Sequence, residues 1–173
     1  ARRVWTALPG AWPEEIAAAV AAVVSAGRGA VVVVPDARDV ERVDRALSER
    51  LGEGRHVALT AELGPAERYA RFLSVSRGAV PVVVGTRAAV WAPVRDLALM
   101  VVWDDGDDLH AEPRAPYCHA REVALLRAHR AGASFLLAGH AVTAEGAQLL
   151  ATGWASELGP SAPARTRDLP AVR

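Results

Sequence analysis

The sequence contains no lysine, so all twenty of its basic residues other than histidine are arginines. A phosphate-binding loop of the usual kind ends in a lysine that contacts nucleotide phosphates, and Schiff-base enzymes need a lysine amine. Neither kind of site can be built from this chain alone. Asparagine is absent and Ile16 is the only isoleucine. We interpret this bias, together with abundant Ala, Val and Arg, as typical of a GC-rich genome.

Cysteine, net charge and long apolar runs are also scarce. Cys118 is the only cysteine, which excludes a disulfide framework or a zinc ribbon within these residues. The formal net charge is zero, so the chain as a whole presents no basic field to nucleic acid. There is no signal peptide, and the apolar runs are too short to cross a bilayer. We therefore expect a cytoplasmic protein without membrane contacts.

The length of 173 residues and the hydrophobic fraction of 51% favour one globular domain. The chain begins at Ala1 without methionine, and residues 159–173 carry three prolines and no periodicity. Such a segment is typical of a linker. We expect a piece of a longer protein, with a folded lobe over residues 1–158 and a linker over 159–173 toward a second lobe.

Short apolar runs alternate with amphipathic stretches along the chain. Runs without polar alternation indicate strands buried on both faces, and the stretches between them indicate helices. Strands are expected at 4–7, 30–34, 56–59, 82–84, 97–102 and 135–138, and helices at 13–26, 38–51, 64–77, 119–130 and 143–152. In the helix at 64–77, Tyr69, Phe72 and Leu73 should face inward. The alternation predicts an α/β fold with a doubly wound, mainly parallel sheet and helices on both faces.

The run Leu97–His110, LALMVVWDDGDDLH, is the centre of the predicted sheet. Acids just past the carboxyl end of a buried strand lie where open α/β sheets bind ligands, and in nucleotide-hydrolysing folds such an acid holds Mg²⁺. Here Trp103 follows the apolar run, and the acids begin one residue later. Asp104 and Asp105 are weak candidates for a divalent cation. Their spacing does not match an EF-hand loop, and a solvated loop tip is the simpler interpretation.

The loop TALPGAWP at 6–13 lies between the first strand and the first helix, where a phosphate loop would lie. Such a loop needs glycines for close backbone approach, a lysine for the phosphates and a hydroxyl for Mg²⁺. Gly10 is its only glycine, and Trp12 and Pro13 occupy the last two positions. An indole cannot neutralise phosphate, and proline offers neither a hydroxyl nor an amide hydrogen. An ordinary turn is favoured, with Gly10 as the single remaining candidate nucleotide contact.

Three other motifs have residue types that could support a function. Gly85–Thr86–Arg87 follows a buried strand and fits either a phosphate-backbone contact or a turn with a paired arginine. The spacing of His110, Cys118 and His119 matches no structural zinc site. No G-x-S-x-G motif supports a hydrolase.

Four segments carry a family resemblance. They are VVVVPDARDV at 31–40, VVVGTRAAVWAPVRDLALMVVWDD at 82–105, YCHAREVALLRA at 117–128 and LLAGHAVTAEG at 136–146. In this order they resemble the first helicase lobe of the PriA family of primosomal replication-restart proteins, which has V-P-E, I-G-T-R-S-A-x-F-x-P, D-E-E-H, R-Y-H-A-R-D and G-S-A-T-P-S. The G-T-R segment joined to Y-x-H-A-R is the specific part. The resemblance implies a RecA-like sheet, a P-loop NTPase-type fold with a degenerate loop.

The differences from the family fall on its catalytic positions. The resemblance places the phosphate-loop lysine and threonine at Trp12 and Pro13, and the Mg²⁺-holding aspartate at Trp103. The glutamate expected to polarise the attacking water falls on Asp104 or Asp105. Because phosphoryl transfer depends on these charges, we expect no catalytic residues here, and neither ATP nor Mg²⁺ as a cofactor.

The positions that face DNA in the family pattern agree better with this sequence than the catalytic positions do. The resemblance implies that Thr86 and Arg87 face single-stranded DNA, with Tyr117 from the family's aromatic loop and Arg121 from the Y-x-H-A-R segment. It implies a scaffold that binds branched DNA and helps to recruit the replicative helicase, without ATPase or helicase activity of its own. Its partners would be forked or single-stranded DNA and other primosome and replication proteins.

Two alternative functions remain open. One is an active ATP-dependent 3′–5′ DNA helicase with an unusual phosphate loop, in which an arginine of another lobe replaces the lysine. The other is an unrelated α/β metal- or phosphate-dependent enzyme with a metal site at 104–108. A nucleotide pocket filled by Trp12 and Trp103 would favour the scaffold, whereas an open acidic pocket would favour the metal enzyme.

Overall fold

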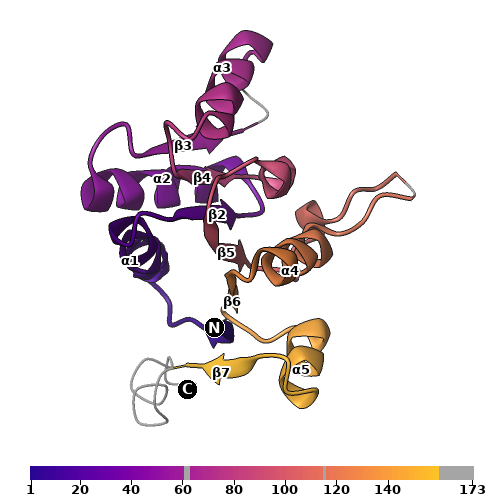
Figure 1. Cartoon of the computed structure of the whole chain (residues 1–173). Helices are drawn as coiled ribbons and strands as arrows, with labels where there is room; N and C mark the ends of the chain where they lie inside the picture. The colour runs from indigo at the N-terminus through magenta and orange to yellow at the C-terminus, as the bar shows by residue number, and fades with distance from the viewer. Residues whose placement is uncertain (61–62, 115, 160–173) are drawn as a thin grey trace, which may run out of the picture.

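Seven parallel strands form the centre of the molecule (Figure 1). The computed structural model describes residues 1–60, 63–114 and 116–159. The strand order is β3-β4-β2-β5-β6-β1-β7. The strands are β1 (Arg2–Thr6), β2 (Gly29–Val33), β3 (His56–Leu59), β4 (Val82–Gly85), β5 (Leu97–Trp103), β6 (Ser134–Gly139) and β7 (Ser156–Leu158). The helices are α1 (Trp12–Ser25), α2 (Ala37–Leu51), α3 (Pro65–Ser76), α4 (Ala120–Ala131) and α5 (Ala144–Ala151), with 3-10 turns η1 (Arg87–Trp91) and η2 (Asp108–His110).

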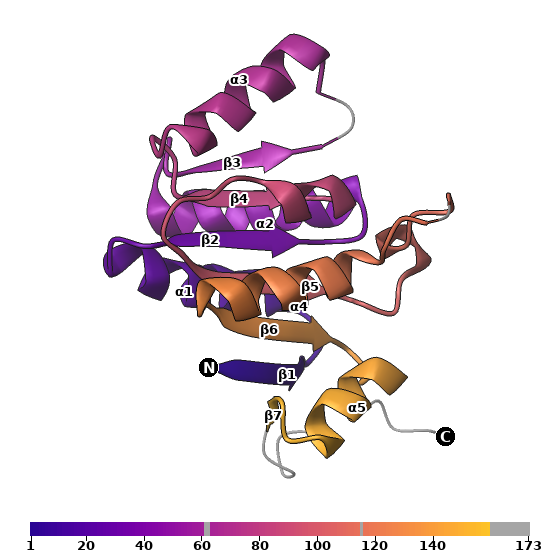
Figure 2. The ribbon, with the colours of Figure 1, turned by 45° about the vertical axis from the view of Figure 1, so that its right-hand side comes forward.

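The apolar runs form strands buried on both faces, as predicted. Along β2, Val31 and Val33 pack into one core, whereas Ala30 and Val32 pack into the other. Helices α1 and α2 cover the second of these cores, and η1, α4 and α5 cover the first. Figure 2 shows the resulting layers, with α4 in front of the strands. This arrangement confirms the doubly wound α/β sheet.

All of the strand pairs are parallel, so the carboxyl ends meet at one edge, toward which the arrowheads of β2, β3 and β6 point in Figure 2. Thr6 pairs in register with Gly139, and Trp103 with Ala138. The loops after β1, β5 and β6 are therefore neighbours although they lie far apart in the sequence. Open α/β sheets bind their ligands at this edge, so the candidate site is sought there.

The prediction that Tyr69 and Phe72 face inward is wrong. Their exposed fractions are 64% and 40%, and Val75 is the buried residue of α3. The reason is topological: α3 follows β3, which is an edge strand, and projects past the sheet (Figure 1). Among the strands of the described residues, none lies beyond β3 to cover the aromatic side chains of α3.

The sequence also missed β7, because its three exposed residues have no apolar pattern. This strand forms through backbone pairing with β1. The predicted linker at 159–173 lies outside the described residues, apart from Gly159. Over the described part of the chain, none of the helices combines the length and apolarity needed to cross a bilayer.

Candidate functional site

Two indole rings occupy the junction between β5 and the start of α1. Trp12 is the first residue of α1, and Trp103 is the last of β5. Their ring centroids are 3.9 Å apart with planes 6° apart, and both side chains are buried. The rings are therefore stacked on each other. In the fold that the sequence resembles, this is where a phosphate loop and a metal-holding acid would face a nucleotide.

The stack is part of a larger tryptophan cluster, which we define as Trp5, Trp12, Trp103, His140 and Arg42. Trp5 lies 6.2 Å from Trp103 between ring centroids, and the His140 ring meets Trp103 edge-on at 5.1 Å. The Arg42 guanidinium lies 4.8 Å from the centroid of Trp12, a cation–π contact. The cluster closes the space between β1, α1, α2 and β5.

The start of α1 is poorly suited to bind phosphate. A helix N-terminus normally attracts anions through its free amide hydrogens and its dipole. Here Pro13 removes one amide hydrogen, and Glu14 and Glu15 place two exposed carboxylates in the first turn. Gly10 is exposed and serves the preceding turn, with a φ of 111°. These features disfavour phosphate binding at the start of α1, and they do so independently of the stacked indoles.

Asp104 and Asp105 have different environments. Asp104 is exposed with a φ of 51°, and its amide donates to the Ala138 carbonyl at 2.7 Å, which keeps the strand end paired. Asp105 is 4% exposed. Its Oδ2 accepts hydrogen bonds from Arg121 and Thr143, both at 2.9 Å. The Asp105 carboxylate is thus held by the protein and is not free to orient a water.

The described residues contain no group of three or more His, Cys, Asp or Glu arranged to hold a metal ion. Other acids lie near this loop. The pKa of Asp39 is raised, first by burial and then by the negative charge of Asp36. Arg42 pairs with Asp39 at 3.3 Å and so partly offsets this charge. The open acidic metal pocket of the alternative enzyme is not seen in this part of the chain.

Arg121 does not lie where the sequence predicted. Its side chain is 7% exposed and pairs with Asp105 at 2.9 Å, Glu145 at 2.9 Å and Glu122 at 3.0 Å. Four of its five N–H groups donate to these carboxylates and to the Asp105 carbonyl, and the side chain is buried, which leaves little of the guanidinium for a phosphate. Arg121 therefore joins α4, α5 and the acid loop within the fold, and its burial in this network argues against the DNA contact that the resemblance implies.

His110 fixes the other side of the acid loop. Its side chain is fully buried, and Nε2 donates to the Trp103 carbonyl at 2.8 Å. Nδ1 is buried without a hydrogen-bond partner. Burial lowers the pKa of His110, so the ring is neutral with the proton on Nε2. This bond ties η2 back to the end of β5.

Thr86 and Arg87 lie at the same edge of the sheet, after β4. Their turn requires Gly85, because a Cβ there would lie 2.4 Å from the Leu59 carbonyl oxygen. Arg87 donates to the carbonyls of Leu109 at 3.1 Å and Ala111 at 2.6 Å. Both residues line a hollow of about 390 Å³ that also includes Thr60 and Asp36. Thr86 and Arg87 are therefore accessible from solvent at the strand ends.

A second hollow, of about 210 Å³, lies on the other side of Arg87. Tyr117 and Cys118 line it from the loop before α4, and Trp91 lines it from the end of η1. The exposed fractions of Tyr117 and Trp91 are 67% and 63%. Sequence reasoning missed Trp91, although it stands at the aromatic position of the family's G-T-R-S-A-x-F pattern. We refer to Arg87, Trp91 and Tyr117 with this hollow as the aromatic pocket.

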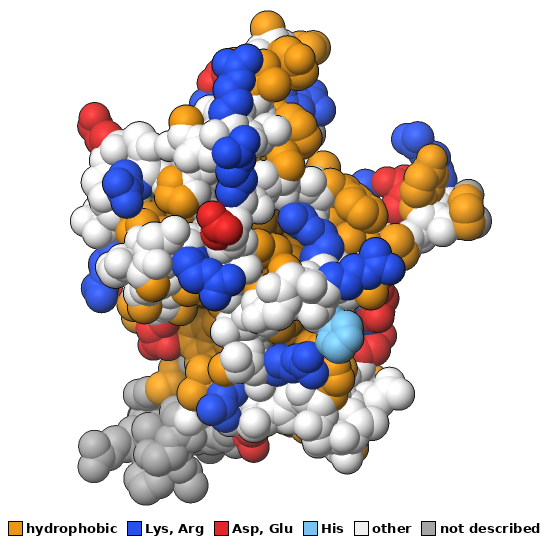
Figure 3. Space-filling model, in the orientation of Figure 1, with side chains coloured by type: hydrophobic (Ala, Val, Ile, Leu, Met, Phe, Trp, Pro, Cys, Tyr) orange, Lys and Arg blue, Asp and Glu red, His pale blue; other side chains and the backbone are white. Residues whose placement is uncertain are grey.

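Charges on the face shown in Figure 3 are mixed. Arginines are scattered among acids and apolar side chains, without a continuous basic field. This agrees with the zero net charge of the sequence. Nucleic-acid contacts on this face would therefore depend on a few positioned side chains.

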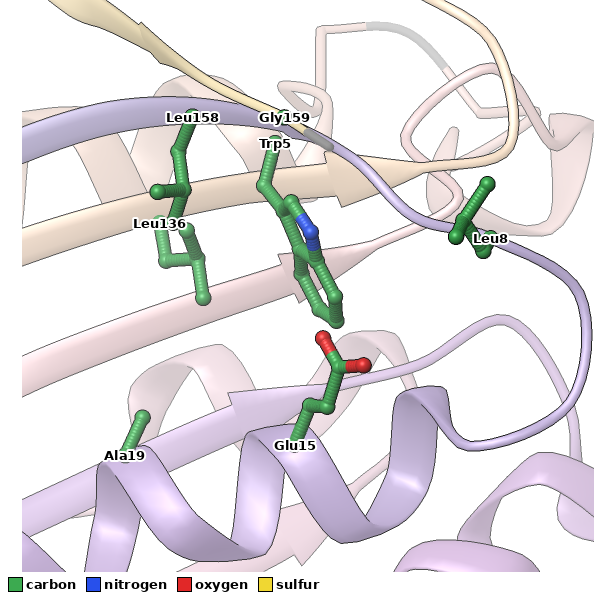
Figure 4. Close-up of a pocket in the computed structure, with 7 residues that line it drawn as sticks. All are labelled: Trp5, Leu8, Glu15, Ala19, Leu136, Leu158 and Gly159. Carbon is green, nitrogen blue, oxygen red and sulfur yellow. The ribbon is translucent and has the colours of Figure 1, made fainter. Parts of the chain in front are cut away.

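An apolar cavity of about 340 Å³ lies between α1 and strands β1, β6 and β7 (Figure 4). Trp5, Leu136 and Leu158 line it, with Glu15 pointing toward the Trp5 ring. None of its lining residues carries a positive charge. The cavity therefore offers no side chain that would neutralise the charge of a phosphate.

Solved helicase structures share this fold. The TM-score is 0.60 with domain 2 of the DEAD-box helicase Mss116p bound to an RNA duplex, at 10% identity, covering 96% of this chain and 67% of that one. It is 0.58 with the DUF1998 helicase MrfA bound to DNA, at 11% identity, covering 86% and 22%. At such low identity, these likenesses establish a RecA-like helicase-lobe fold.

Sequence comparison gives the family. The probable replication restart protein PriA of Mycobacterium leprae is 52% identical over 159 residues, and that of Mycobacterium tuberculosis 50%. Each match covers 91% of this chain and 24% of the relative. The PriA of Bacillus subtilis is 27% identical over 106 residues, 61% of this chain and 13% of that protein. No family model matches the sequence. The chain is therefore PriA-like, and it spans about a quarter of the length of its mycobacterial relatives.

Proposed function

We propose that this chain is a helicase-like lobe of a replication restart protein that binds forked or single-stranded DNA and helps to reload the replication machinery, with no ATPase activity of its own. One observation carries the proposal: Trp12 and Trp103 stack at 3.9 Å where a nucleotide would bind. The names of the relatives support the restart role. A helicase of the same fold has been solved bound to DNA, which supports the DNA contact.

An active helicase is the weaker alternative. An arginine from another lobe could replace the missing lysine charge, but it could not remove the indoles. Opening the cavity would separate two buried rings and expose their apolar surface to water. The buried Asp105 would also have to leave Arg121 and Thr143 before it could act on a water.

Calorimetric titration of Mg·ATP into the chain is expected to give no heat of binding, corresponding to a Kd weaker than about 1 mM, or roughly −4 kcal/mol. The physical reason is that the indoles occupy the cavity and that Glu14 and Glu15 repel phosphate. The same titration on the longer protein with forked DNA should also give none. A sub-millimolar Kd accompanied by a change in tryptophan fluorescence would show that the stack opens, and would contradict the proposal.

Binding of oligothymidylate should depend on Arg87. The Arg87→Gln variant is expected to bind more weakly and to lower the slope of log K against log salt by about 0.7, the value for one lost phosphate contact on a single strand. Arg50→Gln is the matched control, because Arg50 is exposed in the last turn of α2, at the opposite edge of the sheet. Equal effects of both variants would indicate non-specific attraction only.

A further inference from the structure

We infer that Trp91 and Tyr117 form a stacking platform for a base of single-stranded DNA, beside the phosphate contact at Arg87. The inference rests on the proposed function and adds to it the mode of recognition. The exposure of Trp91 is the first observation. Trp5, Trp12 and Trp103 are buried, whereas Trp91 is 63% exposed and lines the aromatic pocket.

The backbone holds Trp91 outward. Its neighbours Val90 and Ala92 are each 1% exposed and pack into the core. Arg127 of α4 donates to the carbonyl of Val90 and, at 2.9 Å, to that of Ala92. With both neighbours anchored, the backbone that carries the Trp91 side chain is held at the surface. A contact residue held in place before binding loses little conformational entropy when it binds.

The aromatic pocket also has the charge that a nucleotide needs. Bases stack on aromatic faces irrespective of sequence, while cationic side chains contact the backbone phosphates. The Glu112 carboxylate in the pocket wall is paired with Arg87 at 2.8 Å and with Arg114 at 3.7 Å, which offsets its negative charge. Arg114 is itself 85% exposed, and the two arginines facing one carboxylate leave a net positive charge of one beside the pocket.

Single-stranded DNA fits these features better than duplex DNA, because the bases of a duplex are stacked on each other and cannot pack against Trp91. Two hollows flank Arg87, one lined by Thr86 and Thr60 and the other by Trp91 and Tyr117. A strand crossing this edge would place its backbone over Thr86 and Arg87 and turn one base into the aromatic pocket.

Affinity for oligothymidylate tests the platform. Trp91→Ala is expected to weaken binding by roughly ten- to hundred-fold, the effect of losing one base–aromatic stack, whereas Trp91→Phe should keep most of the affinity. The matched control is Tyr69→Ala, an equally exposed aromatic on α3. Because Trp91 is exposed, its removal should leave the fold intact, which circular dichroism can verify.

Cys118 provides an independent readout. It is exposed, lines the aromatic pocket and is the only cysteine of the chain. Bound oligothymidylate should slow its reaction with a thiol reagent such as DTNB, and a duplex of equal length should not. Trp91→Ala should remove this protection at oligonucleotide concentrations that protect the unmodified chain.

The outcomes separate this inference from the proposed function. If DNA binds in an Arg87-dependent way while Trp91→Ala has no effect or Cys118 stays unprotected, the stacking platform is wrong and the phosphate contact remains. If the unmodified chain does not bind single-stranded DNA at all, the proposed DNA role of this lobe fails as well. Equal protection of Cys118 by duplex DNA, or protection by a protein partner only, would also overturn the platform.

Discussion

Trp103→Ala is expected to lower the free energy of unfolding by about 3–5 kcal/mol, the usual cost of removing a large aromatic side chain from a core. Trp103 is 3% exposed and contacts three rings, those of Trp5, Trp12 and His140. Its loss would leave a cavity at the end of the central strand, where β5 pairs with both β2 and β6. Denaturation by urea, followed by far-UV circular dichroism, measures the effect without relying on tryptophan emission.

A double-mutant cycle isolates the stack itself. Trp12→Ala should cost about as much as Trp103→Ala, and the double variant less than the sum, because the two rings share one contact. Trp91→Ala is the control and should change stability by no more than about 0.5 kcal/mol. A cost below about 1 kcal/mol for Trp103→Ala would mean that the cavity is tolerated. The nucleotide position would then be less firmly closed than the stack suggests.

Arg121→Ala is expected to destabilise the fold by about 3–5 kcal/mol, because removing one partner of a buried ion pair leaves the other charge uncompensated. The charge left behind is that of Asp105, which is 4% exposed. Glu145 and Glu122 are about half exposed and can turn to solvent. Most of the cost should therefore come from Asp105.

A variant that lacks both charges tests this account. The pair Asp105→Ala with Arg121→Ala should be less destabilised than the sum of the two single variants. Arg114→Ala provides the exposed control, since its pair with Glu112 spans 3.7 Å and its side chain is 85% exposed. If Arg121→Ala cost no more than Arg114→Ala, the network around Arg121 would be incidental to stability.

The sequence predicted the parallel sheet because its strands are apolar without alternation and stand between amphipathic helices. It also placed Trp12 and Trp103 at the nucleotide positions through the family resemblance. It could not show that the two rings stack, because that distance depends on β1 and β5 both flanking β6 in the sheet. Pair distances of this kind are set by strand order and not by local pattern.

Individual side chains were harder to place than strands. Arg121 looked like a surface residue of a DNA-binding segment, but the first turn of α4 brings it against Asp105 and Glu145. Tyr69 and Phe72 have a helical spacing typical of a buried face, but the edge position of α3 leaves them exposed. In both cases the neighbours that decide burial come from other parts of the chain.

The tryptophan stack has a consequence for timing. A ligand shifts a conformational equilibrium only when it binds one state better than another. If indoles take the place of the ligand, as proposed above, this lobe would have no nucleotide-driven alternation between tight and loose states, and the lifetime of its DNA complex would depend on DNA dissociation alone. Under the function proposed above, the lobe would act as a stationary clamp at the fork while other proteins arrive, and forward movement along the strand would come from a different motor.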